Sequence, residues 1–118
     1  MTTFRLIPLS VHGALEMLTG LVLMLAPFMV SLSPAGGVAA VTLGAILVGV
    51  ALTSMDVGDR SVGVGAHYAL DHGVALGLLA GAISLLALAG DAAAALVLAL
   101  AALLQLTLSV TTRYSLGR

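Results

Sequence analysis

Residues 9–30 read Leu-Ser-Val-His-Gly-Ala-Leu-Glu-Met-Leu-Thr-Gly-Leu-Val-Leu-Met-Leu-Ala-Pro-Phe-Met-Val, an apolar run interrupted near its start by His12 and Glu16. A bilayer core is about 30 Å thick, so a helix needs roughly 20 apolar residues to cross it. The run therefore predicts a membrane-spanning helix with two ionisable side chains on one face, because residues four apart are neighbours on a helix. We expect Pro27 to kink or end this helix.

Three further apolar stretches follow, at about residues 38–54, 64–88 and 92–110. The segment 31–37, rich in Pro and Gly, separates the first two, and the polar segment 56–61 separates the next two. Gly90 and Asp91 form a tight turn, with Asp91 as the expected N-cap of the last helix. Ala and Leu dominate and no period-two alternation is seen, which favours helices over strands. The sequence predicts an all-α membrane protein, one domain over residues 1–118 with four transmembrane helices.

The composition excludes several classes of protein. Hydrophobic residues make up 61% and charged residues 8% of the chain, against roughly 25% charged in soluble domains. Mean hydropathy is +1.24. There is no Cys, which excludes disulfides and thiolate metal sites, and the net charge of −1 with no Lys excludes a basic nucleic-acid patch. No nucleotide-binding, hydrolase or zinc-protease motif is present.

The basic residues predict the orientation. In a four-span topology, all of them fall on the side that holds both termini and the middle loop: Arg5, Arg60, Arg113 and Arg118. The positive-inside rule makes that side cytoplasmic. We therefore expect a multi-pass protein of the bacterial plasma membrane with both termini in the cytoplasm. A cleaved signal peptide, with residues 17–30 as its apolar region, is the alternative, and His12 and Glu16 are unusual for one.

The chain also carries an internal repeat. A shift of 55 residues places Arg5 on Arg60, His12 on His67 and Glu16 on Asp71. Matches of Ala and Leu are expected by chance in this composition. Matches of Arg, His and carboxylates are not, because these residues are rare in the chain. The match predicts two tandem two-helix repeats, at about residues 5–59 and 60–114. Since both would enter the membrane in one direction, they should be related by a pseudo-two-fold axis along the membrane normal.

The repeated pattern of His, Leu and a carboxylate before an apolar helix resembles the Ser-Pro-Trp (SPW) repeat family of small bacterial membrane proteins. The residues that carry the resemblance are Pro8, His12, Leu15, Glu16 and Pro27 in the first half, and His67, Leu70 and Asp71 in the second. The chain departs from the family in having no Trp, in Ala82 at the second-half equivalent of Pro27, and in Glu16 where Asp is usual. The resemblance implies a four-span repeat fold and no settled activity.

The two His–carboxylate pairs are the candidate site. Ionisable groups in a membrane usually face the protein interior, so the repeat predicts that His12, Glu16, His67 and Asp71 converge. Such a cluster is consistent with a polar contact that fixes helix packing, with proton or ion handling, or with a divalent metal such as zinc, iron or manganese. A haem between His12 and His67 is a further alternative. We expect no cofactor if the packing interpretation holds.

Other residues predict helix contacts. Gly73, Gly77 and Gly81 form a glycine zipper, which favours close packing against another helix of this chain or, alternatively, homodimerisation. Gln105 is expected to hydrogen-bond across helices, with help from Thr107. His72 lies about 100° around the helix from Asp71 and is expected to be an interfacial histidine outside the cluster.

Three functions follow as hypotheses. The first is a structural, accessory or interaction protein, held in the lipid bilayer and associating with itself or a larger membrane protein. The second is a proton or metal-ion carrier or channel that uses His12, Glu16, His67 and Asp71. The third is a membrane-embedded redox or lipid enzyme, whose chemistry would have to lie inside the bundle because the loops are short.

Overall fold

The computed structural model describes residues 6–55 and 64–113 of the chain. It is an elongated helical bundle of 46 × 26 × 20 Å. Its elements are β1 (Ile7–Pro8), α1 (Leu9–Met29), α2 (Pro34–Met55), α3 (Val64–Ala89), α4 (Ala92–Thr111) and β2 (Thr112–Arg113). Each of the four helices is long and apolar enough to cross a membrane. The fold is therefore all-helical apart from the two-residue strands, as predicted.

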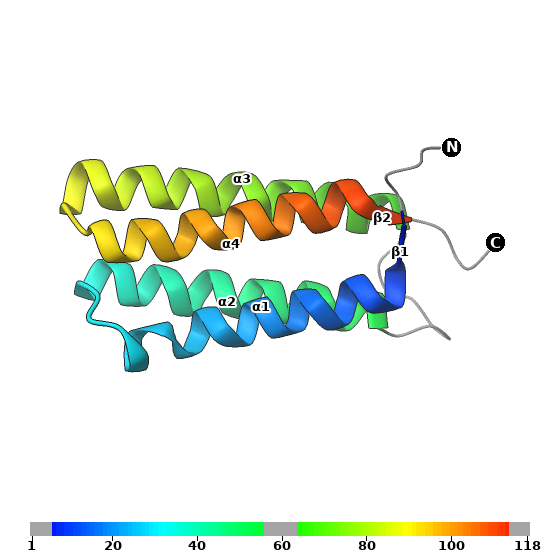
Figure 1. Ribbon diagram of the computed structural model, residues 1–118, viewed down its shortest axis with the longest axis horizontal. Helices are drawn as coiled ribbons and strands as arrows, with labels where there is room; N and C mark the ends of the chain where they lie inside the picture. Colours follow the sequence, from blue (N-terminus) through cyan, green and yellow to red (C-terminus); the bar gives the residue numbers. More distant parts are fainter. Residues whose placement is uncertain (1–5, 56–63, 114–118) are drawn as a thin grey trace.

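The helices pack as two pairs, α1 with α2 and α3 with α4 (Figure 1). Contacts within each pair are more extensive than contacts between the pairs. At one end of the bundle β1 pairs in parallel with β2, with Ile7 opposite Thr112 and Pro8 opposite Arg113. This pairing places the start of α1 beside the end of α4. The connections after α1 and after α3 lie at the opposite end (Figure 1).

The outer surface is apolar along the length of the bundle. Phe28 is 83% exposed and Leu88 is 87% exposed, and many other large apolar side chains are exposed on all four helices. Water-soluble monomers rarely expose contiguous apolar surface on this scale. The core between the helices contains one fully buried leucine from each: Leu23, Leu47, Leu78 and Leu98. A surface as apolar as the core is what a bundle surrounded by lipid requires.

The helix boundaries differ from the sequence prediction at one place. Helix α2 begins at Pro34 rather than near Val38. Proline suits the first turn of a helix, where its missing N–H would have no partner. The Ser33 hydroxyl oxygen accepts a hydrogen bond from the Gly36 N–H at 3.0 Å and so caps the new start. Pro27 lies inside α1, two residues before the helix ends at Met29.

Asp91 links the α1–α2 connection to the α3–α4 connection, at the end of the bundle opposite β1 and β2. One carboxylate oxygen accepts from the Ala94 N–H at 2.9 Å, which confirms the predicted N-cap of α4. The other accepts from the Ser33 N–H at 2.7 Å. Hydrogen bonds from Ser33 and from the Ala94 N–H hold the pKa of Asp91 below its ordinary value. The preceding Gly90 has a φ of +62°, which glycine adopts without strain.

Two glycines make a close backbone contact within the first pair. A Cβ added to Gly20 would sit 2.7 Å from the Gly44 carbonyl oxygen, and one added to Gly44 would sit 2.6 Å from that of Gly20. On α3, a Cβ added to Gly73 or Gly77 would meet nothing within 4 Å, and one at Gly81 would make ordinary contacts only. The close intramolecular packing expected at Gly73 and Gly77 is therefore absent. Their homodimerisation alternative stays a prediction.

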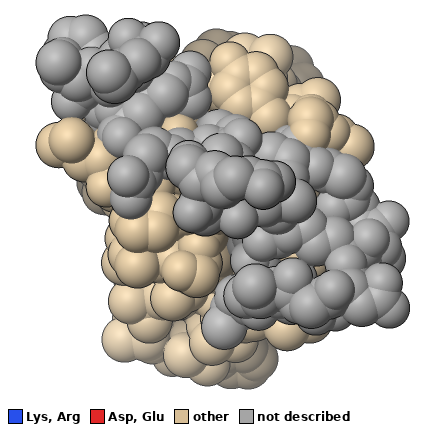
Figure 2. Space-filling model, turned by 90° about the vertical axis from the view of Figure 1, so that its right-hand side faces the viewer, with Lys and Arg blue, Asp and Glu red and all other residues tan. Residues whose placement is uncertain are grey.

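The structure leaves the predicted orientation open. Arg5, Arg60 and Arg118 lie outside the described residues, and Arg113 is described only through its backbone in β2. The end of the bundle that holds β1 and β2 is viewed in Figure 2, where no described acidic side chain reaches the visible surface. The carboxylates of α1 and α3 instead point inward.

The glycine contacts give a matched prediction. Gly20→Ala or Gly44→Ala places a methyl group within 3 Å of backbone, so each should destabilise the folded chain by about 1–3 kcal/mol through overpacking. Gly77→Ala adds the same methyl to open space and should change stability little or increase it, because Ala favours a helix over Gly. Unfolding in detergent, followed by circular dichroism, measures both. Equal destabilisation by Gly77→Ala would contradict the assigned packing.

The lowered pKa of Asp91 predicts how the stability of the folded chain depends on pH. Because its pKa is lower in the folded chain, its ionised form stabilises the fold above its ordinary pKa, and this contribution is lost as pH falls through the folded value. Asp91→Asn should therefore lower the melting temperature at neutral pH, and the difference from the wild type should shrink as the solution is acidified. Melting curves of both proteins between neutral and acidic pH test this. A difference that grows on acidification would overturn it.

Candidate functional site

The structure brings together the four ionisable residues that the sequence singled out. His12 and Glu16 project from α1, and His67 and Asp71 project from α3. All four are buried, with exposed fractions between 0 and 2%. One nitrogen or oxygen atom from each residue lies within 4.8 Å of the others. The convergence that the repeat predicted is therefore present.

The imidazole nitrogens and carboxylate oxygens alternate. His12 Nε2 lies 2.9 Å from Asp71 Oδ2 and 3.6 Å from Glu16 Oε2. His67 Nε2 lies 3.3 Å from Asp71 Oδ1 and 3.6 Å from Glu16 Oε1. The two rings meet edge to face, with centroids 5.9 Å apart. Each carboxylate thus bridges both histidines, and each histidine faces both carboxylates.

One threonine fixes the outer side of each imidazole ring. The Thr112 hydroxyl donates to the Leu108 carbonyl at 2.5 Å, and its oxygen lies 2.7 Å from His12 Nδ1. A hydroxyl has one hydrogen, and a carbonyl can only accept. The Thr112 oxygen must therefore accept from His12 Nδ1–H. The same bond then directs His12 Nε2 toward the carboxylates.

His67 is held in the same way from the other helix pair. The Thr53 hydroxyl donates to the Val50 carbonyl at 2.6 Å, and its oxygen lies 2.8 Å from His67 Nδ1. By the same reasoning His67 Nδ1–H is the donor. Both imidazoles therefore carry a proton on Nδ1 and present Nε2 to the carboxylates, an orientation that metal-binding histidines commonly show.

Gln105 closes the cluster from α4. Its Nε2 donates to Glu16 Oε2 at 2.6 Å and lies 3.4 Å from Asp71 Oδ1. The predicted hydrogen bond of Gln105 across helices is thus confirmed. Its Oε1 has no hydrogen-bond partner among residues 6–55 and 64–113. Thr107, expected to help, instead donates to the Leu103 carbonyl of its own helix.

Thr53 and Thr112 are not among the residues that the sequence singles out. The 55-residue shift places Thr53 on Leu108 and Thr112 on Val57, so the repeat conceals their common role. Thr53 lies in the last turn of α2 and Thr112 directly follows α4, so the two are one helical turn away from positions that the repeat would match. The only available signal was a hydroxyl residue near the end of each apolar span that faces the histidine end of the bundle.

The positions of the imidazole protons show that the cluster needs added positive charge. With one proton on each Nδ1 and both carboxylates ionised, the inner atoms are two nitrogen lone pairs and carboxylate oxygens, all acceptors. Such a cluster carries two buried negative charges, and uncompensated buried charge is strongly unfavourable. It becomes neutral when both Nε2 atoms are protonated or when one divalent cation binds between them.

His72 lies outside this cluster, as expected. Its Nδ1 is 2.9 Å from the Tyr68 carbonyl oxygen, one turn earlier on α3. The His72 and Tyr68 rings stack at a centroid distance of 4.3 Å. His72 is half-buried and faces the groove between α3 and α4.

No family model, curated protein or solved structure matches this chain. The resemblance to the SPW repeat family therefore rests on the sequence pattern alone.

The threonines can be tested with a control in the same chain. Thr53→Val keeps the shape but removes the acceptor for His67 Nδ1–H, which should destabilise the fold by about 1–3 kcal/mol because a buried donor loses its partner. Thr112→Val should do the same at His12. Thr107→Val is the control, since Thr107 is exposed and bonds its own helix. Unfolding curves in detergent measure all three, and equal effects at Thr53 and Thr107 would contradict this assignment.

Proposed function

We propose that this chain is a small integral membrane protein that binds one divalent transition-metal ion between its two helix pairs. The observation that carries the proposal is the convergence of His12 Nε2, His67 Nε2 and two carboxylates, with each imidazole fixed on its outer side by a threonine. Two imidazoles and two carboxylates suit zinc, iron(II) or manganese(II). The two carboxylates also match the charge of a divalent ion.

The spacing supports the same proposal. Bonds of about 2.0–2.2 Å from a tetrahedral zinc ion place neighbouring ligand atoms about 3.3 Å apart. The four nitrogen–oxygen separations in the cluster, measured to both oxygens of each carboxylate, are 2.9, 3.3, 3.6 and 3.6 Å. A set of one ligand atom from each residue lies within 4.8 Å. Gln105 would orient Glu16, in the way that residues behind a metal ligand usually do.

The position of the cluster favours tight binding of an ion over transport of ions across the membrane. His12 is in the first turn of α1, so the cluster lies near one end of the bundle. Its four ionisable residues have at most 2% exposure. An ion held there would link α1 to α3, where contacts between the helix pairs are sparse. Metal binding then serves a structural or accessory role in the bacterial plasma membrane, with the arginine-bearing side in the cytoplasm.

Protonation is the second candidate, and one distance favours it. His12 Nε2 and Asp71 Oδ2 are 2.9 Å apart, the length of a charge-assisted hydrogen bond. Two imidazolium–carboxylate pairs would also neutralise the cluster and could relay protons. The haem alternative fits poorly, because carboxylate oxygens lie within 3.6 Å of each Nε2, where a porphyrin plane would have to pass.

Metal analysis of the purified chain tests the proposal. The wild type, dialysed in detergent against zinc, iron(II) or manganese(II), should retain about one ion per chain, because preformed ligands bind structural zinc tightly. The double variant His12→Gln, His67→Gln should retain none. His72→Gln is the control and should bind like the wild type. Circular dichroism shows whether each variant keeps its helices.

A folded wild type that binds none of the three ions would overturn the metal proposal and favour protonation. Liposomes carrying a pH gradient then separate a proton relay from a purely structural contact. Proton flux that is lost in Asp71→Asn identifies the relay.

A further inference from the structure

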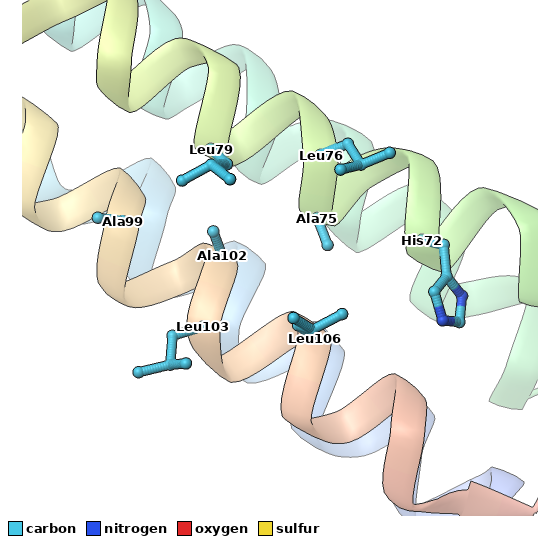
Figure 3. A pocket seen from close by; sticks show the side chains of 8 residues that line it. All are labelled: His72, Ala75, Leu76, Leu79, Ala99, Ala102, Leu103 and Leu106. Atoms are coloured by element: carbon cyan, nitrogen blue, oxygen red, sulfur yellow. The ribbon is translucent and has the colours of Figure 1, made fainter.

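A groove of about 410 Å³ runs between α3 and α4 on the outside of the bundle (Figure 3). Its floor contains Ala75 and Ala102, which are 6% and 7% exposed. Its walls are leucines that face outward: Leu76, Leu79, Leu103 and Leu106. The volume lies within the range of about 300–1,000 Å³ typical of small-molecule sites. Because α3 and α4 are both membrane-spanning candidates, the groove opens toward the acyl chains of the bilayer.

The two helix pairs differ in the residues at their crossings. The predicted 55-residue shift pairs Gly20 with Ala75 and Gly44 with Ala99. In the first pair the two glycines bring α1 and α2 into backbone contact. In the second pair, Ala75 and Ala99 both line the groove. Alanine methyl groups thus line the groove at the positions that the shift pairs with the contacting glycines of α1 and α2.

One polar side chain, His72, lies at an end of this apolar groove (Figure 3). Its Nδ1 lies 2.9 Å from the Tyr68 carbonyl oxygen, which can only accept, so Nδ1 carries the hydrogen of that bond. In the neutral imidazole the other nitrogen, Nε2, is then an acceptor. The groove therefore offers a long apolar surface and a single hydrogen-bond acceptor at one end.

We propose that this groove binds a single-chain membrane amphiphile with a hydroxyl head group, of the class of monoacylglycerols and long-chain alcohols. The hydrocarbon chain lies along the alanine floor between the leucines. The hydroxyl donates a hydrogen bond to His72 Nε2. From His72 to Leu79 the groove extends about 10 Å along α3, at 1.5 Å per residue, so it takes part of one chain and leaves the rest in the bilayer.

This site does not depend on the metal proposal. Asp71 belongs to the cluster and His72 to the groove, but they point about 100° apart around α3. His72 is the control in the metal experiment, and the cluster histidines can serve as controls here. Failure of one proposal therefore leaves the other standing.

Native mass spectrometry of the detergent-purified chain tests the groove with three probes of equal chain length. These are 1-monoolein, which has hydroxyl donors, methyl oleate, which has none, and oleate, which is anionic. We expect one bound monoolein per chain, retained at least about tenfold better than methyl oleate, a ratio worth one hydrogen bond. His72→Phe keeps an aromatic ring without the acceptor and should remove this preference.

Ala99→Leu fills the groove and should abolish retention of monoolein, whereas Ala87→Leu, on the exposed surface of α3, should not. Circular dichroism confirms that each variant keeps its helices. Equal retention of monoolein and methyl oleate, or unchanged binding in Ala99→Leu, would overturn the proposal. Preferential binding of oleate would show a preference for an anionic head group over a hydroxyl and would likewise overturn it.

Discussion

Two carboxylates and two imidazoles share one buried volume, and their charge must be balanced within it. Water cannot supply hydrogen bonds to groups that are 0–2% exposed inside an apolar bundle. The two carboxylates therefore need compensating positive charge, which protons or a metal ion bound by the cluster would supply. Each helix contributes to meeting this requirement. Helices α1 and α3 supply the charged groups, α2 and α4 supply Thr53 and Gln105, and Thr112 of β2 completes the set.

The same cluster also contributes contacts between the two helix pairs. Lipid removes most of the hydrophobic drive between membrane helices, so association depends on close packing and polar contacts. The α1–α2 pair has close packing through Gly20 and Gly44. Contacts between the pairs are sparser, and the contacts of His12 with Asp71 and of His67 with Glu16 cross that interface. The β1–β2 pairing closes the bundle beside them. A change in the charge of the cluster therefore acts where the bundle is least tightly packed.

The sequence predicted what depends on composition and periodicity. Long apolar runs fix the number of spans, Asp91 after Gly90 marks a helix start, and the recurrence of His and a carboxylate brings four side chains to one place. The roles of Thr53 and Thr112 could not be predicted from the sequence. They depend on how the end of one helix lies against the imidazole ring of a histidine on another helix. It also placed close packing at Gly73 and Gly77, where the helix in fact faces outward. A series of small residues shows that a helix can approach another helix closely. Only the fold shows which face of the helix has a neighbouring helix.

The two halves of the predicted repeat differ where their helices cross. Glycine at residues 20 and 44 brings the first pair into backbone contact, and alanine at residues 75 and 99 lines a groove in the second. At the cluster the halves stay alike, with one histidine, one carboxylate and one threonine partner for each imidazole. Charge balance explains this contrast. Removing one group from the cluster leaves the others uncompensated, whereas adding a methyl group at a lipid-facing crossing leaves no buried charge. The cluster therefore constrains both halves equally, whereas the residues at the helix crossing can differ between them.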